Sequence, residues 1–259
     1  MLGAIAGDII GSVHEFECQK TKDFPLFVEQ SRFTDDTVLT VAVADCLLTG
    51  SSYVDKFHDY TRTYPDRGYG LGFRRWIWSG SRQPYNSWGN GSAMPVSPVA
   101  FAFESFAEVL NEAKASAEVT HNHREGIRGA QAAAAATFLA REGESKKTIR
   151  STIEQRFHYD LSRSVADIRP SYSFNESCQG TVPEAITAFL ESEDYEDAVR
   201  LAISLGGDAD TLACIAGGIA AAFFGGVPRN IAVPALARLD DGLRKTVTAF
   251  CKTYRIPLP

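Results

Sequence analysis

The sequence predicts an all-α fold, and two observations carry that prediction. Apolar residues recur at spacings of three and four residues in several separate segments, which is the periodicity of a helix with one buried face. No set of alternating apolar and polar segments is present, and the one Asn-Gly dipeptide, Asn90-Gly91, lacks the alternating flanks of a hairpin. We expect helices over residues 36–48, 98–111, 126–141, 182–190, 196–204, 209–224 and 234–252.

Length and composition are those of an ordinary globular protein. The chain has 259 residues, 44% of them hydrophobic and 22% charged, and no internal repeat. A net charge of −6 argues against nucleic-acid binding, and no apolar run approaches the ~20 residues of a membrane span. No signal peptide is evident. Five scattered cysteines without C-x-x-C pairs favour free thiols over disulfides or zinc. We therefore expect one domain, residues 1–259, acting as a cytoplasmic monomer.

The first segment places Gly3, Gly7, Gly11 and Glu15 at steps of four residues. If this segment is helical, the glycines form a strip that another backbone or a ligand can approach closely. Because each glycine costs about 1 kcal/mol in a helix interior, the strip needs a reason. Tight helix packing with a solvated Glu15 and a functional role for Glu15 are the two interpretations.

Two predicted helices begin with the same unusual composition. Thr34-Asp35-Asp36 precedes one apolar helix, and Asp208-Ala209-Asp210-Thr211 opens another. A single N-cap explains one acid at each start, but not two acids and a hydroxyl. Together these residues form an all-oxygen set, which prefers magnesium, manganese or calcium. If the two helix starts meet, a pair of divalent ions would neutralise them.

Residues 65–91 are rich in glycine and aromatic side chains, which predicts a loop with a local core or with rings that stack on a base or sugar. The loop ends in Gly89-Asn90-Gly91-Ser92, either a plain turn or a phosphate cradle. Ser97 and Pro98 then form a helix-start signal.

Later segments carry weaker signals. His121 and His123 precede a helix and either cap it or contact a substrate. Thr181 and Glu184 form a predicted capping box, and Asp194 is expected to cap the following helix. The polar stretch 142–176 carries no helix prediction.

Taken together, these motifs resemble the ADP-ribosylglycohydrolases, the group that includes dinitrogenase reductase-activating glycohydrolase. The resemblance spans roughly residues 1–228, and residues 178–186 are similar to the compact bacterial branch. The motifs that carry it, in chain order, are Gly7-Asp8-Ile9-Ile10-Gly11-Ser12 with Glu15, Thr34-Asp35-Asp36-Thr37, Gly89-Asn90-Gly91-Ser92-Ala93-Met94, Thr120-His121 and Gly206-Gly207-Asp208-Ala209-Asp210-Thr211.

The resemblance implies an all-α fold with two Mg²⁺ or Mn²⁺ ions in a central cleft. It implies that Glu15 is the acid/base or gating residue, and that His121 borders the ribose. It further implies a diphosphate-binding loop at Gly89, Asn90, Gly91 and Ser92. The implied metal ligands are Thr34, Asp35, Asp36, Asp208, Asp210 and Thr211, among which Asp35 and Asp210 also count as catalytic.

The chain departs from the family pattern at three places. Pro95 stands where an arginine is usual, Ala221 where a glutamate is common, and Phe223-Phe224 where a tyrosine is expected. These changes put the substrate preference in question and leave the metal set intact.

The expected reaction is hydrolysis of the glycosidic bond between ADP-ribose and an acceptor, either a protein side chain or a small conjugate. Two alternatives remain: a metal-dependent phosphoesterase that cleaves the pyrophosphate, and a non-catalytic ADP-ribose-binding protein.

Overall fold

A computed structural model describes residues 1–258 of the chain. Within this range the regular structure is helical, no strand is present, and one isolated bridge joins Gly89 and Ser177. The all-α prediction is confirmed. The α-helices are α1 (Leu2–Gly11), α2 (Asp35–Thr49), α3 (Tyr53–Thr63), α4 (Leu71–Trp78), α5 (Val99–Ala102), α6 (Phe106–Glu118), α7 (Arg124–Arg141), α8 (Lys146–Phe157), α9 (Val165–Ile168), α10 (Cys178–Glu191), α11 (Tyr195–Ile203), α12 (Ala209–Phe223), α13 (Arg229–Ala237) and α14 (Asp241–Thr253), with short 3₁₀ helices η1 (Asn90–Ser92) and η2 (Met94–Val96).

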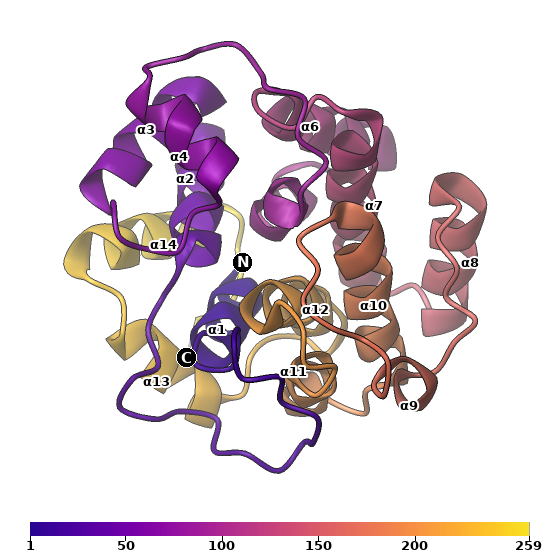
Figure 1. Ribbon diagram of the computed structural model, residues 1–259. Helices are drawn as coiled ribbons and strands as arrows, with labels where there is room; N and C mark the ends of the chain where they lie inside the picture. Colours follow the sequence, from indigo (N-terminus) through magenta and orange to yellow (C-terminus); the bar gives the residue numbers. More distant parts are fainter. Residues whose placement is uncertain (259) are drawn as a thin grey trace.

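The fold is organised around α1 and α12, which pack against each other at the centre of the molecule (Figure 1). Every residue of α1 is buried, which explains its nearly all-apolar sequence. A Cβ added to Gly3 or Gly7 would lie 2.3 Å or 2.1 Å from a carbonyl oxygen of α12, and one on Gly11 would lie 2.6 Å away. The glycine strip therefore serves close helix packing.

Other helices surround this central pair. α2, α3, α4 and α14 lie on one side of it, and α7, α8 and α10 lie on the other (Figure 1). Buried apolar side chains from Met1 to Cys251 form one connected core. None of the helices within residues 1–258 is long and apolar enough to cross a membrane.

The predicted helix over 98–111 is wrong as a continuous element. The chain is extended at Phe103, which separates α5 from α6, and Ser105 caps α6 through a capping box. Ser97 does not cap α5, because its buried hydroxyl has no hydrogen-bond partner among the described residues. Apolar spacing continued across the break, so periodicity alone did not reveal it.

Two further boundaries differ from the prediction. α10 begins at Cys178 with Ser177 as its cap, so the predicted capping box at Thr181 is wrong and Pro183 lies inside the helix. The segment 234–252 divides into α13 and α14, with Asp240 capping the second. The predicted Asp194 cap of α11 is confirmed by its hydrogen bond of 2.8 Å from the Asp197 amide.

Candidate active site

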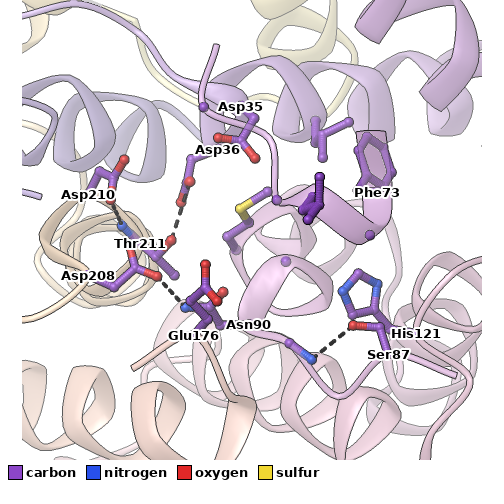
Figure 2. A pocket seen from close by; sticks show the side chains of 18 of the residues that line it. Asp35, Asp36, Phe73, Ser87, Asn90, His121, Glu176, Asp208, Asp210 and Thr211 are labelled. Atoms are coloured by element: carbon purple, nitrogen blue, oxygen red, sulfur yellow. Dashed lines mark hydrogen bonds between the residues drawn. The ribbon is translucent and has the colours of Figure 1, made fainter. Parts of the chain in front are cut away.

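The starts of α2 and α12 meet beside the C-terminal half of α1. One carboxylate oxygen from each of Asp8, Asp36 and Asp210 lies within 4.8 Å of the other two. Oxygens of Glu15, Asp208 and Asp210 meet the same distance limit. Because Asp210 belongs to both sets, the acidic side chains form one continuous cluster, part of which appears in Figure 2.

Asp8 joins this cluster, although it was predicted only as part of the Gly7–Ser12 motif and not as a site residue. Its side chain is fully buried and accepts four hydrogen bonds from α2 and its cap: Thr34 donates through its amide at 3.0 Å and its hydroxyl at 2.6 Å. Thr37 donates through its amide at 3.1 Å and through its hydroxyl. With both oxygens already engaged, Asp8 anchors the start of α2 and orients the Thr34 hydroxyl.

The other buried carboxylates have far fewer partners. Asp36 is 2% exposed; its Oδ1 has no hydrogen-bond partner within the described chain, and its Oδ2 accepts only a long bond of 3.4 Å from Thr211. Asp210 Oδ1 accepts from the Thr211 amide at 3.0 Å. No lysine or arginine forms an ion pair with this cluster among residues 1–258.

Burial and mutual repulsion make these acids hard to ionise together. Burial raises the pKa of Asp8 to about 6, and the pKa values of Asp35, Asp36 and Asp210 are raised well above the ordinary range by burial first and neighbouring carboxylates second. The positive ends of the α2 and α12 dipoles offset part of this cost. An oxygen-rich, buried and cation-free cluster of this kind fits a bound metal ion.

The sequence-predicted ligands occupy two kinds of position: most line the cavity, and one lies behind its wall. Asp36, Asp208, Asp210 and Thr211 are buried and line one cavity, which the half-buried Asp35 also lines. Thr34 lies behind the cavity wall, where its hydroxyl donates to Asp8 and caps α2 by accepting from the Asp36 amide at 3.3 Å. Asp208 stands at the N-cap position of α12 but makes no capping hydrogen bond. The capping interpretation therefore holds for Thr34 and fails for Asp208.

The Gly89–Ser92 turn faces the acidic cluster across the cavity. Asn90 Nδ2 donates to Asp208 Oδ2 at 2.7 Å (Figure 2). It also donates to Thr181 Oγ1 at 3.1 Å. Gly89, Asn90 and Gly91 line the cavity. Ser92 does not: its buried hydroxyl donates to the Gly126 carbonyl at 2.8 Å. The turn is thus tied directly to the start of α12.

His121 lines the same cavity, whereas His123 caps α7 through a hydrogen bond of 3.1 Å from the Glu125 amide. His121 is 6% exposed, and burial lowers its pKa to about 4, so the ring is neutral at physiological pH. Its Nδ1 pairs with the Thr120 hydroxyl at 2.8 Å. That pairing leaves Nε2, which lies close to the glycines of the Gly89–Ser92 turn, available on the cavity side.

Glu15 lies in the turn after α1, half-buried on the cavity wall, rather than at a solvated helix end. Burial raises its pKa to about 7, and the charges of Asp208 and Asp8 add to the increase, while Arg32 opposes it. A carboxyl group with a pKa near neutrality can exchange a proton at physiological pH, which suits acid/base chemistry.

The cavity has a volume of about 280 Å³ and includes residues that sequence reasoning missed. The polar and aromatic members among them are Phe73, Tyr85, Ser87, Phe174 and Glu176, which come from α4 or from loops and share no motif. A neighbouring groove is bordered by Tyr85–Gly89 and Asn175–Ser177. It includes Trp88, whose side chain is 54% exposed. Only the glycine and aromatic content of 65–91 hinted at this wall.

None of the three departures from the family pattern lies on the cavity wall. Pro95 is buried in η2 behind the wall residue Met94. Ala221 and the Phe223-Phe224 pair lie at the far end of α12, a helix of 15 residues that spans about 22 Å at 1.5 Å per residue. There the Phe223 ring packs against Phe189, and Lys146 lies over the rings of both Phe223 and Phe224.

The all-α fold with this acidic cleft is of the kind found in a class of hydrolases. A sequence model of the ADP-ribosylglycohydrolase family matches residues 1–254, and the chain belongs to that family. Its enzymes remove ADP-ribose from conjugates by hydrolysis.

Several characterised relatives refine this placement. The chain is 28% identical to ADP-ribosylhydrolase ARH3 of Homo sapiens over 307 residues, which covers 87% of this chain and 84% of that protein. It is 25% identical to ADP-ribosylarginine hydrolase Tri1 of Pseudomonas putida (strain GB-1), over 87% of this chain and 69% of that protein. A solved structure titled ADP-ribosylglycohydrolase-related protein complex superposes with a TM-score of 0.69 at 25% identity, covering 98% of this chain and 96% of the other.

Proposed function

We propose that this protein uses divalent cations to hydrolyse the glycosidic bond between ADP-ribose and an acceptor, releasing free ADP-ribose. The observation that carries the proposal is the buried acidic cluster, which has no lysine or arginine ion pair among residues 1–258 and lies opposite a glycine-rich turn in one cavity. The family match supplies the reaction class.

Two Mg²⁺ or Mn²⁺ ions are the proposed cofactors. Their oxygen ligands would be Thr34, Asp35, Asp36, Asp208, Asp210 and Thr211. The unpartnered Asp36 Oδ1 supports this assignment. The Thr34 hydroxyl donates to Asp8 and accepts from the Asp36 amide, which leaves it one further lone pair for a cation. When bound, such ions act as Lewis acids and fix the position of ribose hydroxyls or water.

The cavity wall opposite the cluster suits the rest of ADP-ribose. The backbone of Gly89, Asn90 and Gly91 would hold the diphosphate, with Ser92 supporting the turn from behind. The neutral His121 ring would border the ribose. The exposed Trp88 face in the neighbouring groove would stack on the adenine base.

Glu15 would transfer the proton, giving it to the departing acceptor or taking it from the attacking water. A positioned acid/base residue typically contributes about 10²–10⁴-fold to the rate. Its raised pKa leaves a substantial protonated fraction near neutral pH, as a proton donor requires. Breaking the bond leaves a ribose with oxocarbenium character, as in other glycoside hydrolysis.

The substrate class is an ADP-ribosylated protein side chain or a small ADP-ribosyl conjugate. We further propose that residues 1–259 form one monomeric domain that works in the cytoplasm. Helices from both ends of the chain enter one core, and four of the five cysteines are buried free thiols, in keeping with a reducing compartment.

A substrate panel with product analysis tests the proposal. ADP-ribosylated arginine, ADP-ribosylated serine and O-acetyl-ADP-ribose would each be incubated with Mg²⁺ and with Mn²⁺. Intact ADP-ribose as the product supports the proposed reaction. AMP plus ribose phosphate would instead establish the phosphoesterase, and tight binding without turnover of any substrate would establish the ADP-ribose-binding protein.

A further inference from the structure

A lysine outside the cavity joins three chain segments that build the cavity wall. Lys20 Nζ donates to the Arg169 carbonyl at 2.9 Å, to the Tyr172 carbonyl at 2.6 Å and to the Leu205 carbonyl. An ammonium group has three donors, so all of its hydrogen-bonding capacity is used. No other hydrogen bond to these carbonyls is found within residues 1–258.

Each of the three segments carries cavity residues. Lys20 lies five positions after Glu15 in the segment between α1 and α2. Tyr172 lies two positions before Phe174, which lines the cavity, and Leu205 lies three positions before Asp208. The three carbonyls lie 149–185 residues after Lys20 along the chain, and Lys20 bridges their segments to its own.

Two glycines before Asp208 allow the backbone to approach Lys20 and Tyr172 closely. Gly206 has a φ of +69°, and a Cβ there would lie 2.7 Å from the Gln19 carbonyl oxygen and 2.9 Å from Lys20 Cε. A Cβ on Gly207 would lie 2.3 Å from a ring carbon of Tyr172. The turn that leads into Asp208 is therefore packed closely against Lys20 itself and against Tyr172, one of its three partners.

We propose that Lys20 is a positioning residue, which fixes Glu15 relative to Asp208 through these three carbonyls. The carbonyls of Arg169 and Leu205 follow the C-terminal ends of α9 and α11, where a cation is electrostatically favoured. The inference rests on the function proposed above, because it takes Glu15 as the group that transfers the proton.

The chain offers a matched control two residues away. Lys22 belongs to the same segment, but its ammonium pairs at 2.7 Å with Asp197, a surface residue of α11. Lys22→Met therefore removes one ion pair of the segment and leaves the contacts near Asp208 in place. Lys20→Met removes the ammonium and keeps most of the aliphatic stem.

The test compares the wild type, Lys20→Met, Lys20→Arg and Lys22→Met. With the best ADP-ribosyl substrate and Mg²⁺, we expect Lys20→Met to lower kcat about 10- to 100-fold, with KM within about threefold, because small misplacement of a reacting group costs on this scale. Lys20→Arg should recover roughly a third or more of kcat, since a guanidinium also donates to carbonyls. Lys22→Met should match the wild type.

Hydrogen–deuterium exchange gives a readout that does not need turnover. Lys20→Met should speed exchange in residues 12–21 and 204–208 and leave α1 and α12 protected, whereas Lys22→Met should not change residues 204–208. Wild-type kcat or unchanged exchange in Lys20→Met would overturn the proposal, and so would global unfolding of that variant. If the wild type hydrolyses no substrate, the proposed function fails, and the exchange comparison still decides whether Lys20 holds the three segments together.

Discussion

In metal-stripped protein, the acidic cluster should make the stability of the fold fall as the pH rises. A bound divalent cation should oppose this loss of stability. The pKa of Asp8 is raised from 3.8 to about 6, which corresponds to about 3 kcal/mol at about 1.4 kcal/mol per pKa unit. The folded-state pKa of Asp8 lies above its unfolded-state pKa. Its contribution to the free energy of unfolding is therefore fully present below pH 3.8 and is lost as the pH rises through about 6. Asp35, Asp36 and Asp210 shift in the same direction.

His121 acts with the opposite sign. Its folded-state pKa of about 4 lies below the ordinary value of 6.5, so the stability of the fold rises with pH between those values. The two effects partly cancel in the metal-free protein. Because His121 is not among the proposed metal ligands, the difference between the two states reports mainly on the carboxylates.

The assay is thermal unfolding with Mg²⁺ and with a chelator, from pH 5 to pH 8. At a cation concentration of about 100 times Kd, binding stabilises the fold by about 2.7 kcal/mol. In a domain of this size about 1 kcal/mol moves Tm by roughly 2–4 °C, so we expect Mg²⁺ to raise Tm by about 5–11 °C at pH 8. The increase should nearly vanish at pH 5, where protons compete for the carboxylates.

Two results would refute this reasoning. One is a Tm increase with Mg²⁺ that does not vary between pH 5 and pH 8, which would place the cation elsewhere. The other is an unchanged Mg²⁺ effect in Asp36→Asn, since this substitution removes one charge and replaces an unpartnered carboxylate oxygen of the cluster.

Three further predictions concern single side chains. Asp8→Asn should weaken Mn²⁺ affinity about 10- to 100-fold in a direct titration, because an amide cannot replace a carboxylate that accepts four hydrogen bonds; unchanged affinity would count against the anchoring role. Gly7→Ala should lower the free energy of unfolding by about 3 kcal/mol or more in urea, since its Cβ would lie 2.1 Å from the Ala213 carbonyl oxygen, whereas Gly70→Ala, with open space around it, should change it by less than about 1 kcal/mol; equal effects would contradict the packing argument. Lys146→Met should cost about 1–2 kcal/mol by the same measurement, because the ammonium lies 5.2–5.5 Å from three phenylalanine ring centres, and a neutral result would show that this contact contributes nothing.

The sequence was most informative where local chemistry was unusual. Two acids and a hydroxyl at the start of α2 and of α12 indicated that these helix ends share a site, and the structure places them in one cavity. The glycine strip of α1 also predicted that another backbone packs closely against this helix. It did not indicate that this backbone belongs to α12. These signals are local, so one sequence suffices to find them.

Asp8 shows what local patterns leave out. It sits within an apolar helix, and its partners Thr34 and Thr37 are more than 25 residues away, so nothing near it in sequence indicates its role. Phe174 and Glu176 reach the cavity from a loop without a motif. The sequence analysis did not predict α8, because only three of its side chains are buried and the rest of the segment is polar. The buried side chains are Ile149, Ile153 and Phe157.

The most direct test of the central claim is the release of free ADP-ribose by metal-stripped protein to which Mg²⁺ is added back. We expect the wild type to release intact ADP-ribose only after the addition, and Asp210→Ala to release none while remaining folded. Full activity of the stripped wild type, or of stripped Asp210→Ala, would contradict it.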